Sequence, residues 1–145
     1  MLCVTALTND SIADALAMPE YRGVYVAIAR EMLAVAAAHH VQPMAFDGFD
    51  PAAYRPDAPA DAATQSLDAL VAHNRRSAKT HSGIWRDLAI RKRPTEVDAQ
   101  LGIVVRLGAA AGVPTPLTTR VVTMIQEIER GTRPQARENL EALTT

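Results

Sequence analysis

The sequence predicts an all-α protein, and three observations support this fold class. Only 4% of the residues are aromatic, runs that alternate between apolar and polar residues are absent, and alanine is abundant in long stretches with helical periodicity. A chain of 145 residues has the usual size of one domain and is long enough to bury a core. We therefore expect residues 1–145 to form a single helical domain with about six to seven helices.

The first long helix is expected over residues 20–39, where alanines fill much of the surface between larger apolar residues. These larger residues recur at helical spacing and are Tyr21, Val24, Ile28, Met32 and Val35. Residues 41–60 then contain four prolines, a glycine and several aspartates, so no helix continues through them. Because loops of this length in compact domains are often functional covers, we expect a lid here.

A helix resumes over residues 61–76, and it should turn its large apolar residues inward. These are Leu67, Leu70 and Val71. The next helix is expected to begin at Pro94, since proline favours the first helical position and Thr95 and Asp98 have the spacing of a capping box. Gly112 should end this helix.

The helix that begins near Pro94 carries one apolar stripe. Its members are Val97, Leu101, Val104, Gly108 and Ala111. Gly108 lacks a side chain, so we expect a neighbouring helix to approach closely at this position. The pair Thr115 and Pro116 starts a last long helix, which should end at Gly131.

Composition excludes several classes of protein. A net charge of -1 and a pI near 6.4 argue against a mainly electrostatic partner such as nucleic acid. No apolar run reaches the roughly 18 to 20 residues that cross a bilayer, so we expect no membrane contact. The single cysteine, Cys3, cannot form an internal disulfide and should be a buried structural thiol, which favours the cytoplasm.

The N-terminus starts in an apolar segment without the basic residues of a signal peptide. We therefore expect that this chain is one half of a longer protein and carries no leader peptide. No histidine stands in a metal-binding arrangement, so we expect no metal. The chain also has no glycine-rich strand-turn-helix motif, so it should not bind a dinucleotide alone. The basic residues between Arg75 and Arg93 favour a solvated face or a patch for an anionic cofactor or a neighbouring domain, with nucleic acid as a weaker alternative.

One polar segment contains two helix starts, at Ser82 and at Thr95. Its acidic residues, Glu96 and Asp98, have an ordinary explanation as charges that favour the positive end of a helix. Ser82 has a comparable explanation as an N-cap. The alternative is that both starts aim hydroxyls, amides and a carboxylate at a small polar or anionic substrate between them.

The run from Ser82 to Glu129 resembles the C-terminal helical domain of the ketopantoate reductase (2-dehydropantoate 2-reductase) family. The likeness rests on "SGIWRD", a basic stretch, "TEVD", an apolar helix and "GVPTP", and weaker likeness extends over nearly all of the chain. It implies a bundle like the C-terminal domain of 6-phosphogluconate dehydrogenase. It also implies a Rossmann domain in cis or trans that binds NADP, and reduction of a small 2-oxo acid in pantothenate biosynthesis.

The resemblance further implies roles for individual residues. Glu96 would be the catalytic residue and would also contact the cofactor, whereas Ser82, Asn9 and Asp98 would bind the substrate. The family's Lys-Leu-x-x-Asn motif, whose lysine would be the general acid, is not matched. In one register Met1 and Thr5 stand at its lysine and asparagine, and in another the lysine precedes Met1. We therefore expect a divergent domain that is inactive alone and that forms a homodimer. The alternative is a stand-alone helical module for self-association or another interaction.

Overall fold

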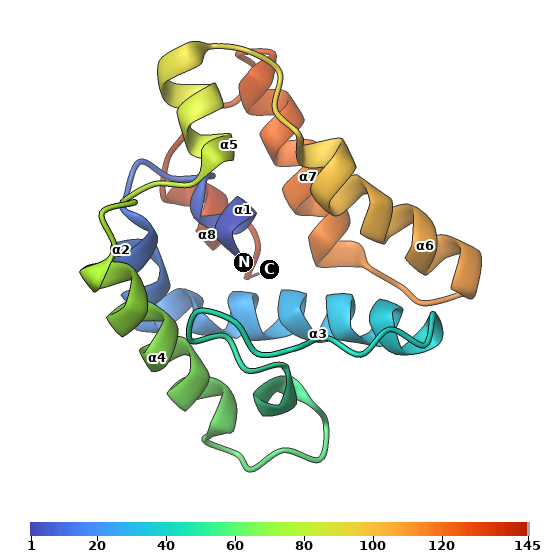
Figure 1. The fold of residues 1–145 in the computed structure, drawn as a ribbon. Coiled ribbons are helices and arrows are strands. Elements are labelled where there is room, and N and C mark those ends of the chain that lie inside the picture. The colour runs from blue at the N-terminus through green and yellow to red at the C-terminus, as the bar shows by residue number, and fades with distance from the viewer. Residues whose placement is uncertain (145) are drawn as a thin grey trace.

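A computed structural model describes residues 1–144, and all regular structure in this part of the chain is helical (Figure 1). The all-α prediction is therefore confirmed. The α-helices are α1 (Leu2–Thr5), α2 (Ile12–Ala17), α3 (Arg22–Ala38), α4 (Ala62–Arg76), α5 (Gly83–Arg86), α6 (Ile103–Ala111), α7 (Pro116–Glu129) and α8 (Glu138–Glu141). The described residues thus contain more helices than expected, because α1, α5 and α8 are single turns of four residues each.

Two π-helical segments lengthen the helices around the polar region predicted as a site. Asp87–Arg91 continues α5, and Asp98–Gly102 leads into α6. The helical turn before α6 begins at Val97 rather than at the predicted Pro94. Short 3-10 turns at Pro19–Tyr21 and Pro51–Tyr54 complete the helical structure.

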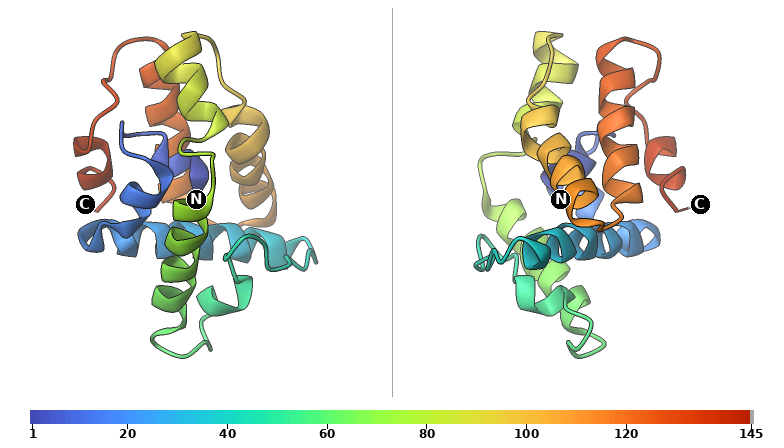
Figure 2. Two further views of the ribbon diagram at one scale, coloured as in Figure 1. Left: turned by 60° about the vertical axis from the view of Figure 1, so that its left-hand side comes forward. Right: turned by 90° about the vertical axis from the view of Figure 1, so that its right-hand side faces the viewer.

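The long helix α3 crosses the molecule and divides it into two parts. Figures 1 and 2 show α1, α2 and α5–α8 on one side of α3, whereas most of α4 and residues 51–61 project on the other. The core forms where the helices meet on α3 and includes Tyr25, Ile28, Leu67 and Ile125, each almost completely buried. Burial of each such side chain contributes about 1.5–3 kcal/mol, so this junction holds the fold together.

The start of α7 is held by a side chain from α3. The Glu31 carboxylate accepts hydrogen bonds from the backbone amides of Leu117 (2.9 Å) and Thr118 (2.8 Å), and from the Thr118 hydroxyl (2.7 Å). Thr115 and Pro116 begin this helix as predicted, but the Thr115 side chain does not cap it. A carboxylate at this position satisfies amides that have no partner within the helix and also favours the helix dipole.

The stripe predicted for the helix that ends at Gly112 is only partly buried. Val97 and Leu101 are buried and Val104 is half-buried, but Ala111 is exposed, because the last turn of α6 extends past its neighbours. The close approach predicted at Gly108 is confirmed, since an added Cβ would lie 2.8 Å from the Val113 carbonyl oxygen and 3.1 Å from a Val35 methyl. Gly112 has φ of 68° and ends α6 as predicted.

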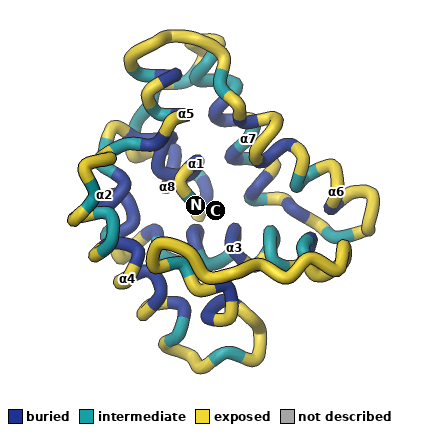
Figure 3. Tube along the Cα trace, in the orientation of Figure 1, coloured by how far each residue is buried: buried dark blue, intermediate teal, exposed yellow. Residues whose placement is uncertain are grey.

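Residues 41–60 contain no α-helix, in agreement with the prediction, but they are not uniformly loose. Residues 41–48 form an exposed strip across the molecule (Figure 3). In contrast, Tyr54 is completely buried, and its ring stacks on Phe49 at a centroid distance of 5.1 Å. The second half of the segment is therefore part of the core, and the lid stays a prediction for the first half.

Candidate functional site

Ser82 lies at the start of α5 and is buried, with 4% of its surface exposed. Its side-chain oxygen accepts a hydrogen bond from the Trp85 amide at 3.1 Å. Trp85 in turn stacks on His81, with ring centroids 3.8 Å apart. Ser82 is therefore an N-cap, as its ordinary explanation predicted, and any contact with a substrate is additional to that role.

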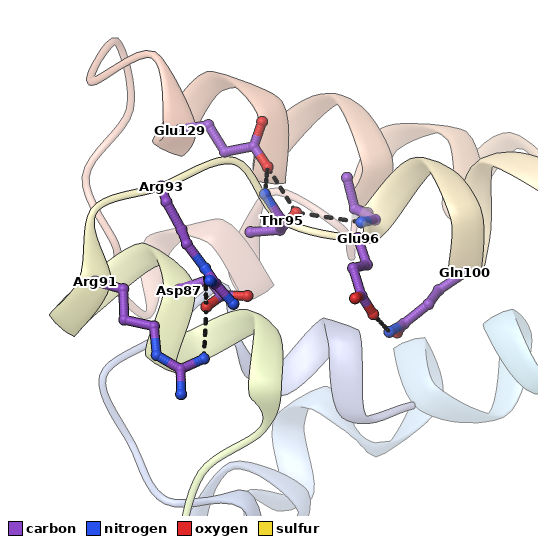
Figure 4. A network of polar contacts seen from close by, with 8 residues as sticks. Asp87, Arg91, Arg93, Thr95, Glu96, Gln100 and Glu129 are labelled. Atoms are coloured by element: carbon purple, nitrogen blue, oxygen red, sulfur yellow. Dashed lines mark hydrogen bonds and ion pairs between the residues drawn. The ribbon is translucent and has the colours of Figure 1, made fainter.

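The second helix start is organised by a residue that the sequence did not reveal. The Glu129 carboxylate on α7 accepts hydrogen bonds from the Thr95 amide (2.7 Å) and the Thr95 hydroxyl (2.6 Å), as Figure 4 shows. The Thr95 hydroxyl oxygen then accepts from the Val97 amide at 3.2 Å. The predicted capping box with Asp98 is therefore wrong, because Glu129 occupies the place at the Thr95 amide.

Glu96 points away from the contact between Glu129 and Thr95. Within residues 1–144 its side chain forms one long hydrogen bond. Its exposed carboxylate accepts a hydrogen bond from the Gln100 amide at 3.4 Å (Figure 4). The side-chain oxygen of Gln100 accepts a hydrogen bond from the Cys3 thiol on α1, with 3.4 Å between oxygen and sulfur. Glu96 is thus connected through one side chain to the first helix of the chain, and its charge faces solvent.

Asp98 and Asn9 have partners elsewhere. Asp98 accepts a hydrogen bond from the Gln126 side chain at 3.0 Å, which connects the π-helical segment to α7. Asn9 donates to the Gln135 carbonyl at 2.8 Å and so connects the N-terminal part to the C-terminal segment. Within residues 1–144, none of the four predicted site residues forms a hydrogen bond with another.

A buried carboxylate organises the basic stretch between the two helix starts. Asp87 is 7% exposed and accepts hydrogen bonds from Arg93 (2.8 Å) and Arg91 (3.0 Å), as Figure 4 shows. These bonds, with that to Arg93 the stronger, hold the pKa of Asp87 below its usual value. Lys92 lies between the two arginines with φ of 50°, in the left-handed region. Two of the basic residues therefore close a turn and are not free to bind phosphate.

Cys3 is buried as predicted, and burial raises the pKa of its thiol. A neutral thiol in an apolar environment is a poor nucleophile, so Cys3 is a structural residue at this position. No three His, Cys, Asp or Glu side chains among residues 1–144 are grouped so that they could hold a metal ion. In the same part of the chain, every helix is too short or too polar to cross a bilayer.

The comparison with protein families gives a direct result. The family model for the C-terminal domain of ketopantoate reductase (PanE/ApbA) matches residues 2–129, which include both helix starts and Glu96. The chain belongs to this family. No curated protein and no solved structure matched the chain.

The match to this ketopantoate reductase family ends at Glu129, so residues 130–144 with α8 lie outside it. α8 nevertheless contributes to the core, since Leu140 is completely buried. The Asn139 side chain also donates to the carbonyls of Leu7 (2.8 Å) and Pro134 (2.9 Å). The last described residues are thus an integral part of the domain.

The described residues lack the motif that usually binds the pyrophosphate of a dinucleotide. A pyrophosphate needs a glycine-rich turn between a strand and a helix, and residues 1–144 provide only helices and their connections. At the nicotinamide end, by contrast, an exposed carboxylate such as Glu96 can accept a hydrogen bond from a carboxamide. The phosphates of a dinucleotide would therefore have to be held by another domain.

Proposed function

We propose that this chain is the substrate-side domain of a reductase that reduces a small 2-oxo acid with NADPH when a Rossmann domain is joined to it in cis or in trans. The single observation that carries the proposal is the family match over residues 2–129. The position of Glu96 supports it. Its exposed carboxylate is connected through the Gln100 side chain to the first helix, so a Rossmann domain joined before that helix would be near Glu96.

In this proposal each site residue has a stated role. NADPH supplies the hydride when bound. Glu96 accepts hydrogen bonds from the substrate hydroxyl or the carboxamide of the cofactor, and Gln100 orients it. Ser82, which also caps α5, Asn9, through its second amide hydrogen, and Asp98 bind the substrate.

Reduction of a ketone also needs a proton donor, because the carbonyl oxygen becomes an alkoxide as the hydride arrives. The two lysines of this chain are Lys79 and Lys92. Neither lies in the first helix, where Met1 and Thr5 stand at the family's lysine and asparagine in one register. We propose that the donor comes from outside these residues, so that the isolated chain is inactive. The single cysteine also leads us to place the protein in the cytoplasm.

The test compares the chain alone with the chain joined to the Rossmann domain of a family member. The isolated chain with NADPH and a panel of 2-oxo acids should oxidise no cofactor, whereas the joined protein should do so. Glu96→Gln should then lower kcat/KM by about 10- to 100-fold, because a hydrogen bond to a charged acceptor contributes about 1.5–3 kcal/mol. The matched control is Glu138→Gln, an exposed acid on α8, which should have no effect. Turnover by the chain alone, or equal activity of the two variants, would contradict the proposal.

We propose homodimer formation as a second property, supported by a groove of about 690 Å³ along α3. Small residues line it, including Gly23, Ala27 and Ala34, and these allow another helix to approach closely. In sedimentation equilibrium, Ala27→Arg should convert a dimer to a monomer. Ala38→Arg, on the exposed end of the same helix, should leave the dimer intact. A wild-type monomer at all concentrations would contradict this property.

A further inference from the structure

A second cavity, with a volume of about 500 Å³, lies between α1–α4 and residues 41–49. This volume is typical of small-molecule sites. Apolar side chains form most of its wall, among them Ile12, Leu16, Met32, Leu33, Phe46 and Phe49. None of Asn9, Ser82, Glu96 and Asp98 lines it, whereas Met1 and Leu2 at the start of α1 do.

The polar groups of this cavity are concentrated at one end. His73, Asn74, Ser77 and Lys79 come from the last turn of α4 and the residues that follow it. The Asn74 side chain already donates to the Leu70 carbonyl, and the His73 ring lies 3.7 Å from the Asp47 carboxylate. Lys79 has no acidic partner within residues 1–144. Asp47 also lines the cavity, and its carboxylate lies beside His73, so Lys79 is the lining lysine that forms no ion pair in this part of the chain.

Pro43, Phe46, Asp47 and Phe49 of the 41–49 segment line the cavity. Gly48 has φ of 89°, and an added Cβ would lie 2.8 Å from the Ala69 carbonyl oxygen, so the tip packs directly on α4. Before the tip, Phe46 is 72% exposed and Met44 is 85% exposed. Of these two, Phe46 lines the cavity, and a large exposed apolar side chain beside an apolar cavity is typical of a binding site.

We propose that this cavity binds an amphipathic carboxylate. Its aliphatic or aromatic body lies among Leu16, Met32 and Leu33, and its carboxylate pairs with the Lys79 ammonium. Charge complementarity selects this occupant, because the apolar wall excludes a compact anion and the free cation favours an acid over a neutral amphiphile. The site goes beyond the proposed reductase function, since Glu96 does not line it.

The first test measures binding of decanoate, octanoate and decanol to the full chain by calorimetry, below the concentrations at which decanoate forms micelles. Decanoate should bind saturably, and each methylene between octanoate and decanoate should strengthen binding about fourfold. Lys79→Met should weaken decanoate binding about tenfold relative to decanol, because it removes a charged hydrogen-bond donor. The matched control is Lys92→Met, the only other lysine, which lies in the turn after α5 and should have no effect.

The second test fills the cavity. Leu33→Trp places a larger side chain in its wall and should abolish decanoate binding. Leu107→Trp alters a leucine on α6 that is 38% exposed and lies outside the cavity, so binding should persist. Thermal unfolding shows whether each variant is folded. Equal binding of octanoate and decanoate, or equal effects of the two lysine variants, would overturn the proposal. The proposal would also be overturned if decanoate did not bind and Phe46→Ser dissociated a dimer, because the cavity would then be filled by a second copy of this chain.

Discussion

The polar segment 82–98 and the 41–54 segment differ in which side chains are fixed by contacts and which are exposed. In the first, polar groups have partners inside the domain, as Ser82 caps α5, Asp87 binds two arginines and Thr95 is fixed by Glu129. Glu96 is the acid there whose charge faces solvent. In the second, Tyr54 is buried while Phe46 is exposed. The Glu96 carboxylate and the Phe46 ring are thus exposed side chains that contribute little to the stability of the fold.

The largest effect should come from the two aromatic residues of the 41–54 segment. Tyr54→Ala removes a completely buried ring that stacks on Phe49 and should lower the free energy of unfolding by about 3–5 kcal/mol. Phe46→Ala should change it by less than about 0.5 kcal/mol, because that ring is 72% exposed. Urea denaturation measures both values. Similar losses would mean that residues 41–46 are packed as firmly as Tyr54.

A glycine in the same segment gives a smaller but specific effect. Gly48→Ala should cost about 2–3 kcal/mol, since the residue has φ of 89° and its Cβ would meet the Ala69 carbonyl oxygen at 2.8 Å. The matched control is Gly112→Ala, which has φ of 68° but no atom within 4 Å of the added Cβ, and should cost about 1 kcal/mol. If the two losses are equal, the tip of the segment is not packed on α4.

Two acids at the 82–98 segment, Glu129 on α7 and Glu96, should differ in their effect on stability. Glu129→Ala removes two hydrogen bonds from Thr95 and should lower the free energy of unfolding by about 2 kcal/mol. Glu96→Ala should leave stability within about 0.5 kcal/mol, because its single bond to Gln100 is long and exposed. Both values come from thermal or urea unfolding. A large loss for Glu96→Ala would assign that carboxylate a structural role and weaken its functional assignment.

Helix bounds, which depend on residues close in the sequence, were predicted better from the sequence than contacts between different helices. The bounds of α3, α4 and α7 and the close packing at Gly108 followed from periodicity, proline and glycine. The capping box of Thr95 with Asp98 was wrong, because Glu129 reaches Thr95 from another helix. The Asp87 cluster was missed for a different reason. Its arginines are close in sequence, but their convergence needs the π-helical turn and the left-handed backbone at Lys92. Nothing yet tests the roles of Asn9, Ser82, Glu96 and Asp98.

The smallest effect expected is the acid dependence of the Asp87 cluster. Arg93 and Arg91 lower the pKa of Asp87 from 3.8, so this carboxylate stabilises the folded state at pH above its unfolded value. That contribution is lost as the pH falls from about 3.8 through the lower pKa of the folded state. The two arginine side chains are 51% and 59% exposed, so solvent screens the pairs and keeps the contribution small.

Asp10 has a pKa lowered by Arg137 in the same way, so acid unfolding of the wild type includes both groups. Asp87→Asn should flatten the fall of stability between about pH 4 and pH 2. Urea unfolding across this pH range measures the slope. A slope equal to that of the wild type would show that this turn is held by its backbone rather than by the ion pairs.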